Sequence, residues 1–282
     1  MSTITLKLSE SDQDHLFETF RDTAGNPPAY AKWQLRPENC VITCYNSGKV
    51  VFQGNDAEIY ASAFQTDDDV ILPQGGSDEV GTGDFFGPVC VAATVVDSST
   101  LDRIRTLGVK DSKALSDSEI RKIAPKLKQL LPHTILIVSP AKYNSVHKTN
   151  NMNAIKAKLH NQAYINLSRK TSLPDFCVVD QFAAKPVYYS YLRREPEVIR
   201  TLHFETKAEN KYPAVGAASV IARNAFLEFM DEMDAKYDMT FSKGSGVPAD
   251  QCAQEFVSRY GKEKLGEVAK LHFKNTEKLN AK

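Results

Sequence analysis

The chain has 282 residues, of which 42% are apolar and 25% charged, and its 35 Lys and Arg balance 35 Asp and Glu. This is the composition of an ordinary globular protein, and no apolar run approaches the roughly eighteen residues of a membrane-spanning helix. The zero net charge argues weakly against an indiscriminate nucleic-acid binder. The five cysteines form no C-x-x-C pair, so we expect buried thiols in a reducing cytoplasm and no zinc site. The first residues lack a basic region followed by an apolar core, so we expect no secretory signal.

The first 68 residues predict a small α+β domain. Hydrophobic periodicity and turn residues define its elements. The expected elements are strands at 3–8, 33–35, 40–45 and 50–53, a helix at 9–22, and a helix capped by Asn55 or Asp56. Residues 1–72 hold five Lys and Arg against eleven Asp and Glu, which leaves thirty against twenty-four in the remainder. A polar, glycine-containing linker is predicted over residues 69–75.

From residue 76 to residue 282, strands alternate with longer helical patterns, which indicates a layered α/β domain. Buried strands are expected at 89–96, 134–138 and 176–180, and helices at 116–131, 153–168, 214–230 and beyond 249. The helix from residue 116 is opened by a capping box of Ser116 and Glu119. No internal repeat or low-complexity segment interrupts this order.

Carboxylates gather at the ends of the predicted strands. Asp78 and Glu79 are adjacent inside a glycine-dense stretch, residues 76–88, which we expect to be a turn ahead of a buried strand. Asp180 ends an apolar strand, and Glu209 lies just before a helix that Pro213 starts. Oxygen ligands at fixed positions are what a hard divalent cation needs. Asp180 capping the next turn and Glu209 as a solvated residue are equally open readings, because spacing alone does not prove that the four meet.

Long motifs in the right order give the chain a resemblance to a known family. The segment 76–88, together with 108–113 and 216–223, is similar to the motifs of bacterial ribonuclease HIII, of the type-2 ribonuclease H group. The resemblance covers about residues 75–275, and a shorter N-terminal extension is also typical of this branch. The fourth acid is Glu209, whereas the sister ribonuclease HII branch usually has Asp there, which supports the HIII assignment.

The resemblance implies a ribonuclease-H-like mixed sheet flanked by helices, preceded by a domain that resembles half of a TATA-box-binding-protein (TBP) saddle. It implies that Asp78, Glu79, Asp180 and Glu209 are the catalytic carboxylates and bind Mg²⁺ or Mn²⁺. Two such cations about 3.5–4 Å apart would support in-line hydrolysis of a phosphodiester. The implied activity is endonucleolytic cleavage of the RNA strand of RNA/DNA hybrids, leaving 5′-phosphate and 3′-hydroxyl ends. We expect cleavage within runs of ribonucleotides, by a monomeric protein of the cytoplasm with no membrane partner.

The same resemblance suggests substrate contacts. Backbone amides of Gly81, Thr82 and Gly83 are expected to reach phosphate and 2′-hydroxyl groups, the latter being how a protein separates RNA from DNA. Further expected contacts are Lys113, Lys207 and Ser219 in the catalytic domain and Lys32, Arg36, Tyr45 and Lys49 in the N-terminal domain. Each lysine is as readily explained as a solvated surface residue, Ser219 as a small packed residue, and the acidic balance of residues 1–72 speaks against a purely electrostatic role.

Three alternative functions are less consistent with the sequence. The glycines at 81, 83 and 87 do not match the spacing of a dinucleotide-binding loop, and they precede their strand instead of following it. A noncatalytic hybrid- or DNA-binding protein on the same scaffold would gain by losing acids near phosphates, so four carboxylates speak against it. Another two-metal nuclease, such as a junction resolvase, would share the fold without these motifs.

Overall fold

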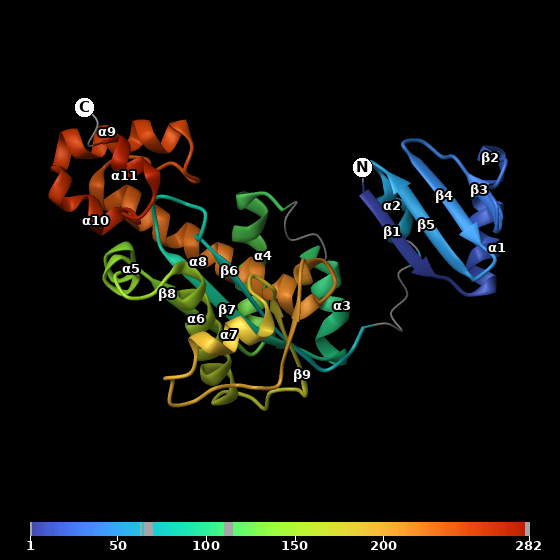
Figure 1. The fold of residues 1–282 in the computed structure, drawn as a ribbon, viewed down its shortest axis with the longest axis horizontal. Coiled ribbons are helices and arrows are strands. Elements are labelled where there is room, and N and C mark those ends of the chain that lie inside the picture. The colour runs from blue at the N-terminus through green and yellow to red at the C-terminus, as the bar shows by residue number, and fades with distance from the viewer. Residues whose placement is uncertain (1, 63, 65–69, 110–114, 280–282) are drawn as a thin grey trace. The chain divides into compact units, whose positions relative to one another are not determined.

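The computed structural model describes residues 2–62, 64, 70–109 and 115–279 (Figure 1). It divides into two compact units, residues 1–70 and 71–282. Each unit has its own sheet and its own buried core.

The first unit is a five-stranded antiparallel sheet with the strand order β1-β5-β4-β3-β2. Its elements are β1 (Ser2–Lys7), α1 (Glu10–Thr19), β2 (Ala24–Gly25), β3 (Ala31–Leu35), β4 (Cys40–Tyr45), β5 (Lys49–Gly54) and α2 (Ala57–Ser62). Side chains on one face, such as Ile42 and Phe52, form a core with Leu16 of α1 and Ala57 of α2. The predicted elements are confirmed, and the two-residue strand β2 was not predicted.

The second unit is a mixed sheet with the order β10-β9-β6-β7-β8. Its strands are β6 (Gln74–Val80), β7 (Val89–Val96), β8 (His133–Val138), β9 (Phe176–Asp180) and β10 (Leu202–Glu205). Strand β9 runs parallel to both β6 and β10, whereas β7 is antiparallel to β6 and β8. The parallel pairing brings the carboxyl ends of β6 and β9 to one edge of the sheet, where their terminal acids lie.

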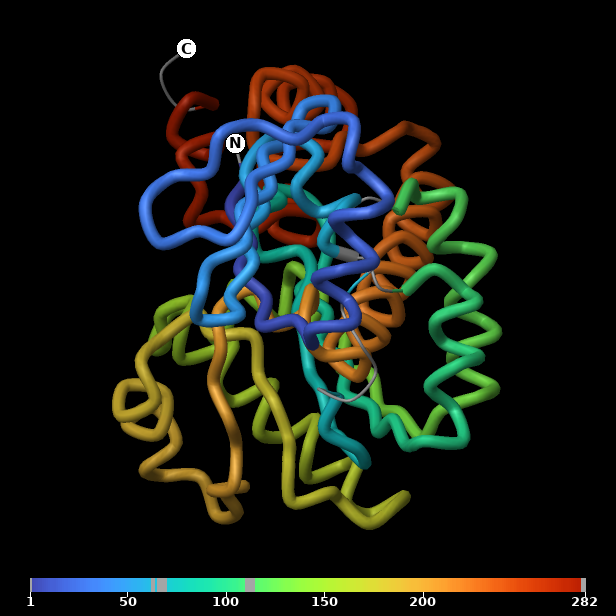
Figure 2. Tube along the Cα trace, turned by 90° about the vertical axis from the view of Figure 1, so that its right-hand side faces the viewer, coloured from blue at the N-terminus to red at the C-terminus, as the bar shows by residue number. Residues whose placement is uncertain are grey.

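Helices flank this sheet, as the sequence predicts. The helices described in this unit are α3 (Ser98–Thr106), α4 (Asp117–Leu130), α5 (Pro140–His147), α6 (Met152–Ser168), α7 (Lys185–Tyr191), α8 (Pro213–Tyr237), α9 (Val247–Tyr260), α10 (Leu265–Val268) and α11 (Lys274–Lys278), of which the last three pack on one another and on α5. Helix α8 packs against β6 and β7 on one face, and α6 covers the other face with Ala157 and Tyr164 in the core. Figure 2 shows α4 beside the long α8, to which the Arg121–Asp231 ion pair joins it.

Two expectations about the strands are wrong. Residues 76–80 and the end of the predicted linker, residues 74–75, lie in strand β6 and not in a turn or linker. The glycine signal has another cause, because a Cβ on Gly76 would collide with the backbone of Ala214 and Val215 in α8. Gly76 therefore lets the first turn of α8 approach the strand closely.

Strand β8 was expected to be buried, but it is an edge strand. Thr134 is buried, whereas Ile137 is half exposed. A continuous apolar run does not distinguish a central strand from an edge strand, because both positions accept β-branched residues.

Candidate active site

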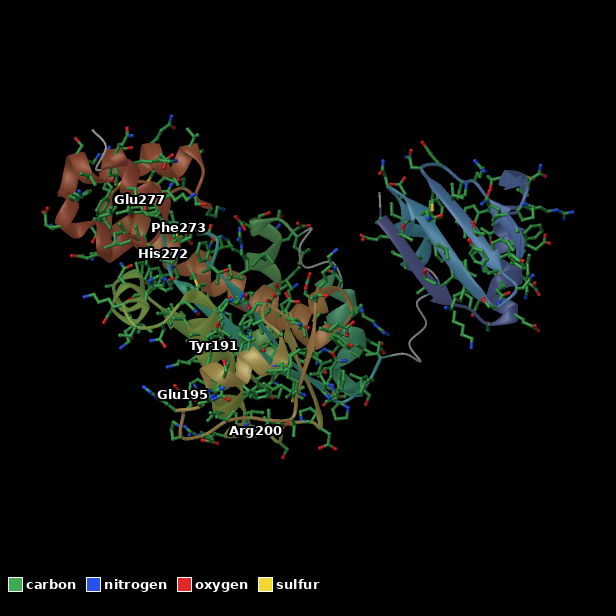
Figure 3. The ribbon with its side chains drawn as sticks, in the orientation of Figure 1. Tyr191, Glu195, Arg200, His272, Phe273 and Glu277 are labelled. Carbon is green, nitrogen blue, oxygen red and sulfur yellow. The ribbon has the colours of Figure 1, made fainter. Side chains whose placement is uncertain are left out.

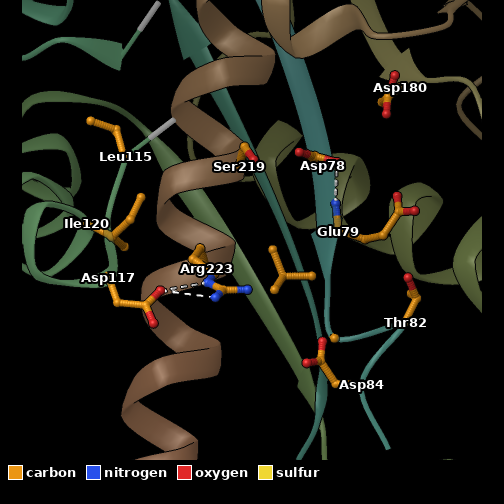
Figure 4. A pocket seen from close by; sticks show the side chains of 12 residues that line it. Asp78, Glu79, Thr82, Asp84, Leu115, Asp117, Ile120, Asp180, Ser219 and Arg223 are labelled. Carbon is orange, nitrogen blue, oxygen red and sulfur yellow. Dashed lines mark hydrogen bonds and ion pairs between the residues drawn. The ribbon is translucent and has the colours of Figure 1, made fainter. Parts of the chain in front are cut away.

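A cavity of about 470 Å³ opens at the carboxyl end of β6 (Figure 4). Its lining comes from β6 and the loop after it, β9, the start of α4, and α8. The lining residues are Asp78, Glu79, Val80, Gly81, Thr82, Asp84, Leu115, Asp117, Ile120, Asp180, Ser219 and Arg223. The structure therefore brings Asp180 to the same cavity as Asp78 and Glu79, although Asp180 is far from them in the sequence.

Asp78 faces α8 and is 8% exposed. Its carboxylate accepts hydrogen bonds from the Ser219 hydroxyl and from the backbone N–H of Glu79, the latter at 2.7 Å. Burial, followed by the negative charges of Glu79 and Asp180, raises the pKa of Asp78 to about 8, and the two hydrogen bonds only partly offset this. A cation beside Asp78 would favour its ionised form.

Glu79 faces the opposite side of β6, toward α6. One carboxylate oxygen pairs with Lys156 Nζ, and the other lies 2.8 Å from His160 Nε2. Burial alone would raise the pKa of Glu79, but the hydrogen bond and charge of His160 and the charge of Lys156 together lower it. Glu79 is thus held in its ionised form.

Asp180 ends β9, and its Oδ1 accepts a hydrogen bond of 3.0 Å from the backbone N–H of Ala208. Ala208 begins a short 3₁₀ turn, Ala208–Asn210, that contains Glu209 and precedes α8. Glu209 is 2% exposed and is not among the residues that line the cavity. The predicted fourth acid is therefore next to the Asp180 contact, but it is buried and is not among the residues that line the cavity.

The structure places the expected substrate contacts of the second unit differently with respect to the cavity. Gly81, Thr82 and Ser219 line the cavity, whereas Gly83 does not. Gly81 has φ of 94°, and a Cβ there would collide with the Pro88 carbonyl oxygen, so the loop requires glycine. Lys207 is exposed and is the N-cap residue of the turn that holds Glu209. Lys113 lies outside the described residues.

In the first unit, Tyr45 and Lys49 lie on the sheet face away from the helices. Neighbouring Cys44 and Val50 point into the core, and side chains alternate along a strand. Lys32 instead donates to Gln13 of α1 at 3.0 Å. Arg36 donates to the Gln34 side chain, also at 3.0 Å.

The sequence analysis missed two groups of side chains. Lys156 and His160 contact Glu79 from α6, and their spacing of four residues is the available signal that both lie on one helix face. At the other end of the cavity, Arg223 donates twice to Asp117 Oδ1, at 3.1 and 3.0 Å, and Lys243 pairs with the second oxygen of Asp117. Asp117 was predicted only to lie in the first turn of its helix.

The donor set of the cavity fits a hard divalent cation. Asp78, Glu79 and Asp180 offer carboxylate oxygens, the ligands that Mg²⁺ and Mn²⁺ prefer. The raised pKa of Asp78 reflects negative charges that a cation would compensate. Among the described residues, no three His, Cys, Asp or Glu side chains are arranged to hold a metal ion as they stand. The three acids line the same cavity, but their carboxylate oxygens do not converge on a single metal position.

No helix in the described part of the chain has the length and apolar content to cross a bilayer.

Two family models match this chain, and they define the class of protein to which it belongs. The family model described as Ribonuclease HII matches residues 75–276, and the one described as Domain of unknown function (DUF3378) matches residues 3–72. The first match spans most of the unit that contains the mixed sheet and the cavity.

Individual relatives narrow the assignment. The chain is 40% identical to "Ribonuclease HIII" of Exiguobacterium sibiricum over 100% of this chain and 97% of that protein. It is 42% identical to "Ribonuclease HIII" of Bacillus cereus (strain ATCC 14579) over 85% of each. The crystal structure of Bst-RNase HIII in complex with Mn²⁺ superposes with a TM-score of 0.77 at 34% identity, covering 99% of this chain and 98% of that one. The chain belongs to the ribonuclease HIII family.

Proposed function

We propose that this protein is an endonuclease that hydrolyses the RNA strand of RNA/DNA hybrids with two divalent cations, leaving 5′-phosphate and 3′-hydroxyl ends. The observation that carries the proposal is the position of Asp78, Glu79 and Asp180 on one cavity, from two parallel strands. A noncatalytic binder of the same hybrids would not need three acids facing a polyanion. Membership of the ribonuclease HIII family also favours the catalytic function.

Asp78, Glu79 and Asp180 would hold Mg²⁺ or Mn²⁺, and Glu209 would complete the set from the turn beside Asp180. The Mn²⁺ complex of the related Bst-RNase HIII supports this assignment. When bound, such cations lower the pKa of an attacking water and neutralise charge on the phosphodiester and the leaving oxygen. Ser219 orients the Asp78 carboxylate, while Lys156 and His160 keep Glu79 ionised. The Ala208 N–H fixes one oxygen of Asp180.

The backbone amides of Gly81, Thr82 and Gly83 would recognise the 2′-hydroxyl groups of the RNA strand. Support comes from Gly81 and Thr82, which line the cavity beside Asp78. An RNA/DNA hybrid differs from duplex DNA by the 2′-hydroxyl groups of one strand, so contacts to them select the strand to be cut. We expect cleavage within runs of ribonucleotides.

Phosphate contacts would come from the cavity rim. Arg223 lines the cavity one turn of α8 beyond Ser219, whose hydroxyl already donates to Asp78, and exposed Lys207 is near Glu209. Lys113 is proposed on its sequence motif. These side chains match the anionic backbone of the substrate.

The first unit, residues 1–70, would form a TBP-like hybrid-binding domain joined to the catalytic domain by a short linker. Its sheet leaves one face free of its own helices, and exposed Thr3 and Thr5 lie there in addition to Tyr45 and Lys49. Hydroxyl and aromatic groups can contact sugars and phosphates without a large positive charge. This face therefore suits polar contacts to the hybrid better than a purely electrostatic one.

We also propose that the protein acts in the cytoplasm as a monomer. All five cysteines are buried and free, which suits a reducing compartment. Size-exclusion chromatography coupled to light scattering would test the monomer, and a stable dimer would contradict it.

The direct test is cleavage of a labelled RNA/DNA hybrid by the purified protein in Mg²⁺ and in Mn²⁺, with duplex DNA as the control. We expect cuts in the RNA strand and none in the DNA duplex. Asp78→Asn and Asp180→Asn should abolish cleavage while the far-ultraviolet circular dichroism stays unchanged. Full activity of either folded variant would refute the assignment of the site.

A further inference from the structure

We propose that Lys156 and His160 of α6 are positioning residues that hold the Glu79 carboxylate in one orientation for the divalent cation. The inference rests on the proposed function. Neither residue lines the cavity, so neither is placed to contact substrate. Both act through Glu79.

The contacts are buried and engage both oxygens of Glu79. Lys156 is 8% exposed and His160 fully buried. Because they are four residues apart on α6, they present one face of the helix to β6. Lys156 pairs with Oε1 of Glu79, and His160 Nε2 lies 2.8 Å from Oε2. A carboxylate has about four lone-pair positions, so two of them stay available to a cation.

The orientation of the His160 ring is itself fixed. Ser77 Oγ lies 2.7 Å from Nδ1, and Ser77 shares a face of β6 with Glu79 because the two are two residues apart. An ionised carboxylate only accepts, so Nε2 is the nitrogen that carries the proton toward Glu79. Ser77, His160 and Glu79 therefore form a chain of hydrogen bonds that begins and ends on the same strand.

Lys156 is also held in place. Its Nζ lies 4.0 Å from the centroid of the Phe182 ring, a cation–π contact. Phe182 follows Asp180 by two residues, and its ring packs 5.5 Å from that of His160, measured between centroids. The side chains that hold Glu79 thus pack against the segment that carries Asp180, and this links the two acidic strand ends.

A purely structural ion pair is the competing explanation. Buried ion pairs add little net stability compared with apolar side chains of similar size, because desolvation offsets their attraction. That explanation predicts effects on stability only. Positioning residues around metal ligands change metal affinity and turnover, and loss of one typically costs about 10- to 100-fold.

The test compares four variants of the full-length protein. Lys156→Met and His160→Ala remove the contacts, while Lys156→Arg keeps the charge and His160→Gln keeps an N–H donor. Lys158→Met is the matched control, because Lys158 is on the same helix but pairs at 3.1 Å with Glu195, labelled in Figure 3. Mn²⁺ binding without substrate is measured by calorimetry, followed by kcat and KM for a hybrid.

We expect Lys156→Met and His160→Ala to weaken Mn²⁺ binding by about 10-fold and to lower kcat at subsaturating Mn²⁺, with KM for the hybrid unchanged. Lys156→Arg and His160→Gln should recover affinity to within about threefold of the parent protein, and Lys158→Met should match it. Lys156→Met decides the question if His160→Ala does not fold. Parental or tighter Mn²⁺ binding by Lys156→Met would overturn the proposal.

Asp78→Asn separates this inference from the proposed function. If Asp78→Asn abolishes cleavage while Lys156→Met binds Mn²⁺ normally, the positioning role fails and the proposed function stands. If Asp78→Asn cleaves hybrids at the parental rate, the proposed function fails and the positioning role fails with it.

Discussion

Asp78 and Glu79 are neighbours on one strand, but their surroundings have opposite effects on them. Asp78 faces α8, where burial and the charges of Glu79 and Asp180 raise its pKa to about 8. Glu79 faces α6, where His160 and Lys156 outweigh burial and lower its pKa. Alternation of side chains along a strand is enough to separate two adjacent carboxylates into different environments.

The difference indicates how the two acids contribute to the site. Glu79 is supplied with positive partners by the protein itself. Asp78 is held by two neutral hydrogen-bond donors, the Ser219 hydroxyl and the Glu79 N–H, so its ionised form depends more on a bound cation. We therefore expect the α8 side of the strand to respond to metal more strongly than the α6 side.

The largest expected effect is on catalysis. Asp78→Asn should lower kcat by about 10³-fold or more, because losing a metal ligand removes on the order of 4 kcal/mol of transition-state stabilisation. Single-turnover hybrid cleavage in Mg²⁺ measures it. Glu79→Gln should also reduce kcat, and unchanged turnover of both variants would remove the basis of the comparison.

The two isosteric substitutions should move stability in opposite directions. Glu79→Gln leaves buried Lys156 without its carboxylate and should lower the free energy of unfolding by about 2 kcal/mol at pH 7.5. Asp78→Asn removes a buried acid surrounded by like charge and should raise it in metal-free protein. Urea unfolding in the presence of a chelator measures both, and shifts of the same sign would contradict the contrast.

The pH dependence sharpens the comparison. The folded pKa of Asp78, about 8, exceeds its ordinary value of 3.8, so its stabilising effect is present below pH 3.8 and is lost as the pH rises toward 8. Between pH 5.5 and 8, metal-free parent protein should therefore lose about 3 kcal/mol relative to Asp78→Asn. Saturating Mg²⁺ should reduce that loss, and parallel pH profiles would argue against the raised pKa.

A smaller effect is expected at the basic end of the cavity. Arg223→Gln should raise KM for the hybrid by about fivefold, with kcat nearly unchanged, because it removes one phosphate contact and no metal ligand. The slope of log affinity against log salt should fall by about one. Lys236→Gln, on the exposed end of the same helix, is the matched control. A kcat effect without a KM effect would exclude the phosphate contact.

The smallest effect is expected in the first unit. Tyr45→Ala combined with Lys49→Ala should weaken hybrid binding by about threefold and leave kcat at saturating hybrid unchanged, because half-buried Tyr45 and exposed Lys49 lie on the open sheet face and are remote in sequence from the acids. Fluorescence anisotropy with the catalytically inactive Asp78→Asn protein measures binding. Unaltered affinity of the double variant would refute the contact.

Local sequence signals predicted much of the fold. The Ser116–Glu119 capping box marks the start of α4, and the apolar run ending at Asp180 is strand β9. Both signals involve residues within a few positions of one another, where backbone preferences dominate. Helix α8 begins at Pro213 as expected but continues to Tyr237, beyond the predicted end at residue 230.

The parts that sequence missed depend on long-range packing. Strand β6 was assigned as a turn because glycine favours turns. Glycine is required at position 76 for another reason, the close approach of helix α8, which begins 137 residues later. The His160 contact to Glu79 spans 81 residues of sequence. The four predicted carboxylates could be named from motifs, but the placement of Asp78 and Glu79 on opposite faces of a strand, and the burial of Glu209 outside the cavity lining, require coordinates.

The close approach at Gly76 has a consequence for the tolerance of this protein to substitution. A single methyl group at position 76 would collide with Ala214 and Val215 and push the first turn of α8 away from β6. Ser219 lies one turn further along the same helix and hydrogen-bonds Asp78. Gly76→Ala would therefore read as an active-site defect in a cleavage assay although position 76 bears no functional group, and compensating mutations should arise in α8 and not among the acids.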